Sequence, residues 1–249
     1  MTPVQVEERF YRHVMGGADL VTFQVQEGET DLWVGVDRES WRLDLPDRVR
    51  EVVRRVRRDL EDYIGRDSRF MTSLVPVPVP EDVPGVVREM AIAAARVGVG
   101  PMAAVAGAVA EEVGRALLGE AGEVIVENGG DIFLCSRKPR RVAILAGTSP
   151  FSMRVGLLIR GDGRPVSVCT SAGRWGHSLS LGRADAAVAV APSGALADAA
   201  ATWLGNLVRE VGDLPTALEQ ARRLSGLTGA VLIKDAQLAA WGDIHLTPV

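Results

Sequence analysis

The stretch EVIVENGGDIFLC, residues 123–135, indicates most clearly how this chain folds. Apolar residues at 124–126 and 132–135 have the composition of two short strands. Asn128-Gly129-Gly130 lies between them, and an Asn-Gly pair between apolar runs is among the strongest short-range signals for a β-hairpin. The segment therefore predicts two antiparallel strands joined by a tight turn. Similar strand patterns occur at 19–25, 30–36, 141–145, 153–159, 186–191, 230–233 and 238–241.

Between these hairpins, apolar residues recur at helical spacing. Helices are expected at 46–64, 86–95, 102–118, 195–209 and 216–224, and the alternating prolines of 74–84 favour an extended strap. Because hairpins outnumber strand–helix–strand units, we expect one α+β domain over residues 1–249, with antiparallel sheets and packed helices. The small-residue helices 102–118 and 195–209 each lie near a glycine-rich polar loop, which suggests two related halves.

Composition limits the kinds of partner. Hydrophobic residues make up 47% of the 249 residues and aromatic residues only 5%, so the core must be built from Val, Ala and Leu. A net charge of -4 gives no electrostatic reason to expect nucleic acid or an anionic membrane as a partner. The arginines of 46–64 are interleaved with acidic residues, which is typical of a solvated helix face. A surface rich in small residues could support a homodimer.

Three features predict the cellular location. The N-terminal stretch MTPVQVEERFYRHVMGG is charged and lacks the apolar core of a signal peptide. No uninterrupted apolar run reaches membrane-spanning length. Cys135 and Cys169 are too few for a disulfide framework, which favours a reducing compartment. The sequence therefore predicts a soluble, cytoplasmic protein.

The turn Asn128-Gly129-Gly130-Asp131 has two interpretations. Its glycines let the backbone approach a ligand closely and can present amide N–H groups to phosphate or carboxylate oxygens. Asp131, at the start of an apolar strand, can accept a hydrogen bond from a hydroxyl or an amide, or bind a metal. The simpler alternative is an ordinary hairpin turn, which this segment taken alone favours.

Asp198 and Thr202 lie four residues apart on a predicted helix, so their oxygens point toward one place. Hard cations such as Mg²⁺ prefer oxygen ligands of this kind, with water or phosphate completing the coordination. Asn206 continues the same stripe by one turn. The alternative is the solvated polar face of an amphipathic helix, although the stripe contains no Lys or Glu. Periodicity does not decide between the two.

The segment VSVCTSAGRWGHSLSLGRADAAVAVAPSG, residues 166–194, places a further polar cluster between two apolar runs. Thr170, Ser171 and Gly173 could bind ligand oxygens through hydroxyls and turn amides, or could form a polar loop with no ligand. Cys169 and His177 could act as a nucleophile and its base. A cysteine at the end of a short strand is more commonly a buried, inert thiol, and we favour this interpretation for Cys169.

The order of these clusters resembles the ApbE-like superfamily, whose main branch contains the FAD:protein FMN transferases. The order is AAVAGAVAE at 103–111, ENGGD at 127–131, CTSAG at 169–173 with His177, and ADAAAT at 197–202. The resemblance covers residues 98–209. The wording of Thr30-Asp31-Leu32, Asn128-Gly129-Gly130-Asp131 and Gly176-His177-Ser178 is more similar to the small cytosolic branch of that superfamily. It implies an α+β fold of two T-fold-like halves with one ligand groove between them.

The resemblance also implies a chemistry. The family transferases bind FAD and, with Mg²⁺, move FMN onto a threonine of a target flavoprotein and release AMP. Their metal-binding Asp and Thr correspond to Asp198 and Thr202, and Asp198 would be catalytic together with His177, which could orient a substrate oxygen. The positions that would line the nucleotide site are Asn128, Gly129, Gly130, Asp131, Thr170, Ser171 and Gly173.

Two departures from the transferases concern activity. Ala106 stands where the transferases carry a Lys, and Ser178-Leu179-Ser180-Leu181-Gly182-Arg183-Ala184 stands where they have a D-P-x-T-G loop. We therefore expect a Mg²⁺-dependent protein that binds FAD or a related nucleotide-like small molecule, and that could cleave the pyrophosphate or transfer FMN. The alternative is a non-catalytic cytosolic protein that keeps the groove for another phosphorylated or anionic ligand.

Overall fold

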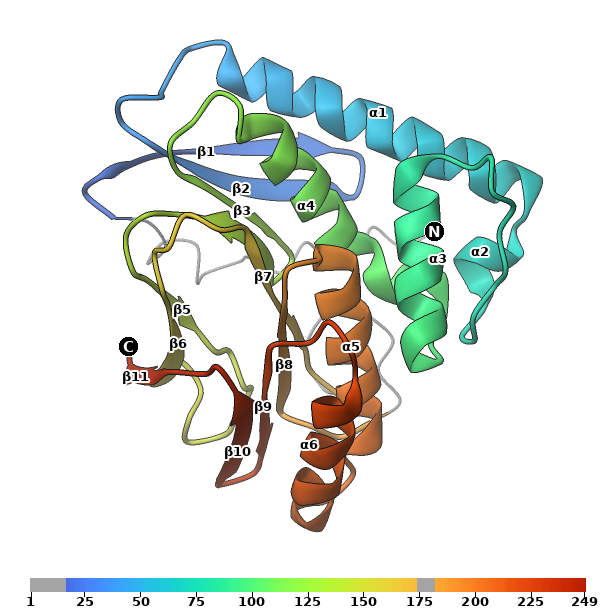
Figure 1. The fold of residues 1–249 in the computed structure, drawn as a ribbon, viewed down its shortest axis with the longest axis vertical. Coiled ribbons are helices and arrows are strands. Elements are labelled where there is room, and N and C mark those ends of the chain that lie inside the picture. The colour runs from blue at the N-terminus through green and yellow to red at the C-terminus, as the bar shows by residue number, and fades with distance from the viewer. Residues whose placement is uncertain (1–16, 174–181) are drawn as a thin grey trace.

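A computed structural model describes residues 17–173 and 182–249, which form two antiparallel sheets and a layer of helices (Figure 1). The larger sheet contains, in spatial order, β1 (Leu20–Glu27), β2 (Thr30–Asp37), β3 (Val124–Asn128), β4 (Asp131–Cys135), β7 (Val166–Ser171), β8 (Ala186–Ala191), β9 (Gly229–Lys234) and β10 (Gln237–Gly242). The smaller sheet contains β11 (Leu246–Pro248), β6 (Val155–Ile159) and β5 (Arg140–Ala143).

The helices cover one face of the larger sheet, and the smaller sheet covers part of the other. They are α1 (Leu45–Arg66), α2 (Arg69–Thr72), α3 (Gly85–Val97), the 3₁₀ turn η2 (Pro101–Ala104), α4 (Val105–Leu117), α5 (Gly194–Leu207), the 3₁₀ turn η3 (Val211–Asp213) and α6 (Leu214–Arg223). Strand β8 shows the arrangement, because Ala187 and Ala189 belong to the core under the helices, whereas Val188 and Val190 belong to the core against the smaller sheet.

The predicted α+β class, with antiparallel sheets and packed helices, is confirmed. The chain order repeats a hairpin, then helices, then a hairpin, first from β1 to β4 and again from β7 to β10. Whether these stretches are T-fold-like halves stays a prediction, as does a single domain over 1–249. The extended strap at 74–84 contains no helix or strand, and the side chains of Val77 and Val83 are buried.

Three of the differences from the expected elements have a clear physical reason. Strand β11 was not predicted, because three residues are too few to show a pattern. The helix expected from 102 begins as the 3₁₀ turn η2, where Pro101 cannot donate a backbone hydrogen bond. Strand β7 continues through Thr170 and Ser171, which were expected in a loop, because β8 pairs with it as far as Ser171.

Small residues bring helices and sheet into close contact. A Cβ atom added at Gly114 of α4 would lie 2.0 Å from the ring of Phe133 on β4. Helix α5 buries Ala195, Ala197 and Ala199 through Ala201. The core therefore uses small side chains where few aromatic residues are present, as the composition predicts.

Five arginines of α1 form ion pairs with acidic side chains. The ion pairs are Arg48–Glu120, Arg50–Asp47, Arg54–Glu27, Arg55–Glu112 and Arg57–Glu61. Among the described residues no single helix is long and apolar enough to cross a membrane. Helix α3 and the segment Pro101–Leu117 are long and apolar enough for a membrane span only when they are taken together. The chain bends by 104° between them.

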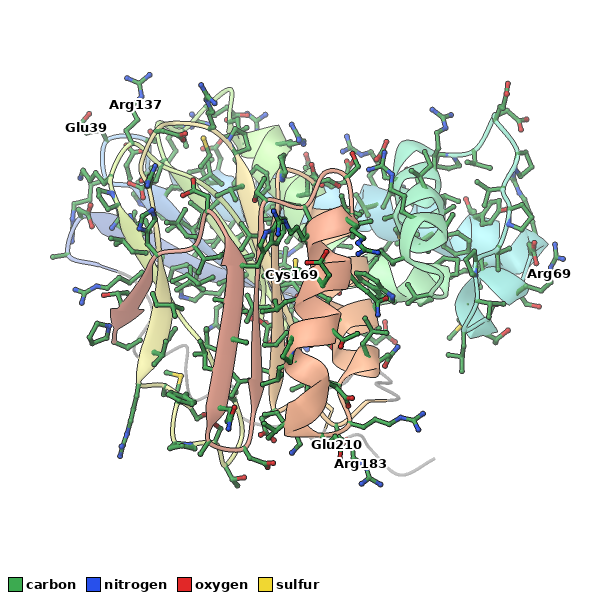
Figure 2. All side chains as sticks on the ribbon, turned by 60° about the horizontal axis from the view of Figure 1, so that its bottom comes forward. Glu39, Arg69, Arg137, Cys169, Arg183 and Glu210 are labelled. Carbon is green, nitrogen blue, oxygen red and sulfur yellow. The ribbon has the colours of Figure 1, made fainter. Side chains whose placement is uncertain are left out.

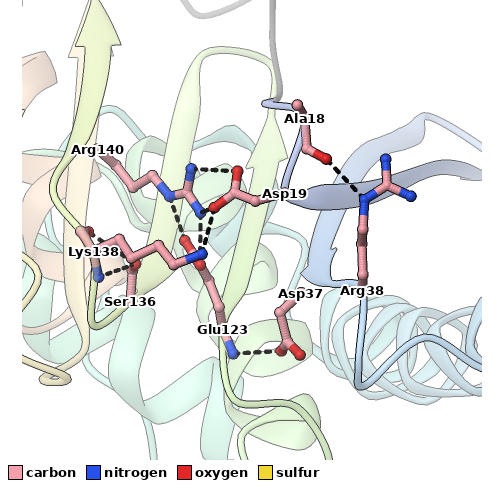
Figure 3. A network of polar contacts seen from close by, with 8 residues as sticks. All are labelled: Ala18, Asp19, Asp37, Arg38, Glu123, Ser136, Lys138 and Arg140. Atoms are coloured by element: carbon pink, nitrogen blue, oxygen red, sulfur yellow. Dashed lines mark hydrogen bonds and ion pairs between the residues drawn. The ribbon is translucent and has the colours of Figure 1, made fainter.

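A partly buried ion-pair network links residues that directly precede β1 and β3 to the start of β5 (Figure 3). Arg140, at the start of β5, donates to both oxygens of Asp19, at 2.8 and 3.1 Å, and to Glu123 just before β3. The Glu123 side chain is 6% exposed, whereas Lys138, the second partner of Asp19, is 62% exposed. The Arg140 guanidinium and the Lys138 ammonium hold the pKa of Asp19 well below its usual range.

Replacing Arg140 by methionine should lower the free energy of unfolding by about 3 kcal/mol, because Glu123 would remain buried without a partner. Lys138→Met is the matched control and should change it by less than about 1 kcal/mol, because this pair is exposed. Urea unfolding of both variants at pH 7 measures the difference. Equal effects would show that the buried contact with Glu123 is not what stabilises this edge.

Candidate functional site

Hydrogen bonds at the helix-covered face of the larger sheet join the β3–β4 turn to α4, β4 to β7, and α5 to α4. The β3–β4 turn is a two-residue turn in which Gly129 and Gly130 have φ of 66° and 102°, the positive values that a type I′ turn requires. Asn128 Nδ2 donates to the Ala106 carbonyl at the start of α4, at 3.1 Å. The Gly130 N–H donates to the Glu127 carboxylate at 2.7 Å, so this turn amide is used within the protein.

Asp131 connects this turn to strand β7. Its Oδ1 accepts a hydrogen bond from the Thr170 N–H at 3.0 Å, and the residue is 6% exposed. Ser171, the last residue of β7, is 3% exposed, and its Oγ has no hydrogen-bond partner in the described part of the chain. A buried hydroxyl without a partner is unfavourable in a folded protein and indicates a polar group that a ligand or water could satisfy.

Asp198 enters the same region from α5. Its Oδ2 accepts a hydrogen bond from the Gly107 N–H of α4 at 2.9 Å. Asp198 is 9% exposed and Thr202, one turn further along α5, is 5% exposed. The stripe therefore lies in a crowded interior position, and the alternative of a solvated helix face is wrong.

Asp131 and Asp198 are close enough to influence each other electrostatically. Burial raises the pKa of both carboxyl groups, and the charge of Asp198 raises the pKa of Asp131 further. Within residues 17–173 and 182–249, the other strong influences on the two groups are backbone amides, the Cys169 thiol and Glu127, and none of these is a cation. In the described part of the chain, the burial of these two carboxyl groups therefore favours their protonated forms unless a cation neutralises them.

The donor set of the cluster consists of oxygens. Carboxylates of Asp131 and Asp198 and the hydroxyls of Thr202 and Ser171 suit a hard cation such as Mg²⁺, which commonly keeps several waters or phosphate oxygens. Residues 17–173 and 182–249 contain no group of three or more His, Cys, Asp or Glu side chains arranged for a metal. A cation here would thus depend on ligand or water oxygens to complete its coordination.

One predicted site position, Gly173, lies apart from these contacts. Gly173 follows β7 and donates its N–H to the Ala184 carbonyl at 2.9 Å, and a Cβ atom there would lie 2.5 Å from the Gly182 carbonyl oxygen. This glycine is thus required by close backbone packing. His177 lies outside the described residues.

Comparison with known proteins places the chain in a family. The family described as AbpE bacteria matches residues 12–239. The chain belongs to this family. It is 42% identical over 195 residues to a UPF0280 protein of Methanocella arvoryzae, covering 78% of this chain and 79% of that protein. A UPF0280 protein of Methanocaldococcus jannaschii is 39% identical over 213 residues, covering 83% and 85% of the two chains.

Solved structures of ApbE proteins share the fold. The flavinyl transferase ApbE of Pseudomonas stutzeri aligns with a TM-score of 0.56 at 17% identity, covering 92% of this chain and 94% of that chain. The ApbE protein of Thermotoga maritima aligns with a TM-score of 0.55 at 10% identity, covering 88% and 96%. The ApbE-like assignment made from the motif order is therefore confirmed at the level of family and fold.

Cys169 is a buried residue on β7, beside α5 (Figure 2). It is 0% exposed, and its Sγ lies 3.8 Å from the Gly194 carbonyl oxygen. Burial and the neighbouring carboxylates raise the pKa of its thiol well above the usual value. Since the thiolate is the nucleophile, this environment supports an inert thiol and opposes a Cys169–His177 enzyme.

We expect iodoacetamide to leave Cys169 unmodified in the native protein at pH 8 and to modify it rapidly in 6 M guanidinium, which exposes the buried thiol. Cys135, which is also buried and unpaired, should behave in the same way. Mass spectrometry of digested protein after timed alkylation measures both. Rapid native labelling of Cys169 would contradict the buried environment and revive the thiol mechanism.

The sequence reasoning missed three residues that build this site, Gly107, Glu111 and Gly194. Gly107 supplies the N–H that Asp198 accepts, and Glu111 accepts the N–H of Gly194 at the start of α5. The signal that could have found them is the repeat of GAVAE at 107–111 as GALAD at 194–198.

Two surface hollows lie elsewhere and do not belong to the cluster. One lies between α5 and α6 and is lined by Trp203, Pro215 and Glu219 among others. The second lies between α1 and α4 and is lined by Arg55, Arg58 and Val113 among others. Neither hollow contains a residue of the cluster, so the candidate site is identified from its polar contacts and not from a cavity.

Proposed function

We propose that the cluster binds FAD or a related flavin nucleotide together with Mg²⁺. The observation that carries this proposal is the pair of buried carboxylates, Asp131 and Asp198, whose strongest electrostatic neighbours among the described residues include no cation. A divalent ion would neutralise this charge and attract the phosphates of a nucleotide. The fold, which is shared with ApbE flavin transferases, favours a flavin nucleotide over other phosphorylated ligands.

The residues divide into two roles in this proposal. Asp198 and Thr202 would hold Mg²⁺, which when bound neutralises charge on a pyrophosphate. Asp198 keeps its position because one of its oxygens accepts the Gly107 N–H. The nucleotide would lie against the more open rim, where Gly129 is exposed and Gly130 and Thr170 are half-buried. The residues that would line the nucleotide are Asn128, Gly129, Gly130, Asp131, Thr170, Ser171 and Gly173.

Cleavage of the pyrophosphate or transfer of FMN is the further step of this proposal. Asp198 would act in it with His177, which would orient a substrate oxygen. The reaction needs charge neutralisation and positioning more than a protein nucleophile, which agrees with the inert environment of Cys169. We place this activity in the cytoplasm, in keeping with two buried cysteines that form no disulfide. A homodimer stays a prediction.

A non-catalytic binding protein is the second candidate, and Ala106 favours it. Ala106 is half-buried at the start of α4, and its carbonyl accepts the Asn128 side chain, so the residue lies at the edge of the cluster. A methyl group there supplies no charge to a reacting phosphate. The same cluster would then hold FAD, or another phosphorylated or anionic small molecule, without changing it.

The test is a titration of purified protein with FAD, followed by flavin fluorescence, with and without Mg²⁺. We expect saturable binding that requires Mg²⁺ and that Asp198→Ala weakens by at least about tenfold, because the ion would lose a charged ligand. Asp62→Ala, an exposed carboxylate of α1, is the matched control and should bind as the wild type does. Absence of saturable binding by the wild type would refute the flavin proposal.

Analysis of the bound sample separates the two candidates. Release of AMP and FMN in the presence of Mg²⁺ would establish cleavage, and their absence after prolonged incubation would favour the binding protein. Thr202→Val removes a hydroxyl oxygen at nearly constant volume. It should therefore raise the Mg²⁺ concentration that FAD binding requires, while leaving the fold intact.

A further inference from the structure

Helices α4 and α5 carry the same five-residue pattern where they meet (Figure 1). Residues 107–111 read GAVAE and residues 194–198 read GALAD. In each helix a glycine is followed four residues later by a carboxylate, so glycine and carboxylate lie one above the other on one helix face.

The two patterns contact each other reciprocally. The Gly107 N–H of α4 donates to Asp198 Oδ2 of α5 at 2.9 Å. The Gly194 N–H of α5 donates to Glu111 Oε2 of α4 at 2.6 Å. Each helix therefore satisfies an N-terminal amide of the other with a carboxylate, an arrangement that the positive helix N-termini favour.

The glycines allow this arrangement because they let the two backbones touch. A Cβ atom at Gly107 would lie 2.3 Å from the Gly194 carbonyl oxygen, and one at Gly194 would lie 2.3 Å from the Gly107 carbonyl oxygen. Such a contact has little freedom to slide. The two hydrogen bonds and the glycine contact together form the α4–α5 clasp, defined by Gly107, Glu111, Gly194 and Asp198.

We infer that Glu111 is the positioning residue for Asp198. Glu111 is 14% exposed, and its second oxygen pairs with Arg115 on its own helix at 2.7 Å, so it is fixed on α4. By holding the Gly194 N–H it fixes the first turn of α5, one turn before Asp198. The hydrogen bond from the Gly107 N–H to Asp198 Oδ2 is thereby maintained, and the orientation of the other carboxylate oxygen of Asp198 is fixed. That this oxygen serves Mg²⁺ rests on the proposed function, whereas the positioning itself does not.

The test is the rate of hydrogen exchange at the Gly107 amide, monitored by NMR in the metal-free protein. This rate reports how often the hydrogen bond between Gly107 and Asp198 opens. Glu111→Ala should accelerate exchange of the Gly107 N–H by about tenfold or more, because the bond to Asp198 would open more often. The buried Val231 amide of β9 is the internal reference for global stability and should change less. Glu219→Ala, which removes the carboxylate of an exposed i,i+4 ion pair on α6, is the matched control, with little change expected at Gly107.

A second pair of variants guards against loss of the fold. Glu111→Gln keeps an oxygen acceptor for Gly194 and should keep Gly107 protected. Glu111→Asp shortens the side chain, so it cannot reach both Gly194 and Arg115, and it should give an intermediate acceleration. Gly107 protection that is unchanged in both Glu111→Ala and Glu111→Asp, or that falls only in parallel with Val231, overturns the inference.

Binding of Mn²⁺, followed by electron paramagnetic resonance, adds a readout of the proposed function. Glu111→Ala should weaken Mn²⁺ binding by about 10–100-fold, the usual effect of removing a group that orients a metal ligand. Failure of the wild type to bind Mn²⁺ would count against the proposed metal site alone, and Gly107 exchange would still decide the role of Glu111. Wild-type affinity in a folded Glu111→Ala variant would overturn the inference and leave the metal site standing.

Discussion

Replacing Gly107 by alanine should lower the free energy of unfolding by about 3 kcal/mol, and Gly194→Ala should have a similar effect. Each new methyl group would lie 2.3 Å from a carbonyl oxygen of the facing helix, and at Gly107 also 2.8 Å from Asp198 Cβ. Neighbouring side chains can often rotate away from an added methyl group. Here the obstacle is backbone, so α4 and α5 must separate, which places the cost at the upper end of the range for overpacked cores.

The double variant and a control glycine make this prediction specific. Once one methyl group has separated the helices, the second has less to displace, so the double variant should cost less than the sum of the single variants. Gly65→Ala in α1 is the control, because nothing lies within 4 Å of its added Cβ, and it should stabilise by about 0.5–1 kcal/mol. Guanidinium unfolding at 25 °C measures all four proteins. Neutral single variants would show that the α4–α5 contact is looser than the structure indicates.

The parts of the fold that depend on local chemistry could be predicted. The Asn-Gly-Gly turn requires positive φ at two positions, which glycine permits, and the β3–β4 hairpin formed where expected. The proline-rich strap could not become helix or ladder strand. The spacing of Asp198 and Thr202 on α5 also followed from helical periodicity.

The parts of the site that depend on packing between distant segments could not be predicted in this way. A glycine inside a helix lowers helix propensity, and nothing local at Gly107 indicates that another backbone touches it. Thr170 and Ser171 belong by composition to a loop, yet the pairing of β7 with β8 keeps them in the sheet. The burial of Asp131 beside Asp198 required two segments separated by more than sixty residues to meet, and only the order of the motifs pointed to it.

The metal-free protein should lose stability as the pH rises from about 5 to about 8. In the unfolded chain Asp131 and Asp198 lose their protons near the ordinary pKa of aspartate, about 4, whereas burial raises the pKa of both in the folded protein. Above pH 4 the folded state therefore holds protons that the unfolded state has released. The free energy of unfolding must then fall with pH, by about 1.4 kcal/mol per pH unit for each proton retained, until the raised pKa is passed.

Asp131→Asn and Asp198→Asn should each reduce this slope and stabilise the metal-free protein at pH 8, because a neutral amide needs no proton to remain buried. Asp62→Asn, on the exposed face of α1, should leave the slope unchanged. Urea unfolding between pH 5 and pH 8 in a chelating buffer measures the profiles. Millimolar Mg²⁺ should restore stability to the wild type at pH 8 but have little effect at pH 5, since protons and the cation compete for the same carboxylates. A wild-type stability that rises with pH, or asparagine variants that follow the wild-type profile, would show that these two carboxylates do not carry the excess charge from which the metal site is inferred.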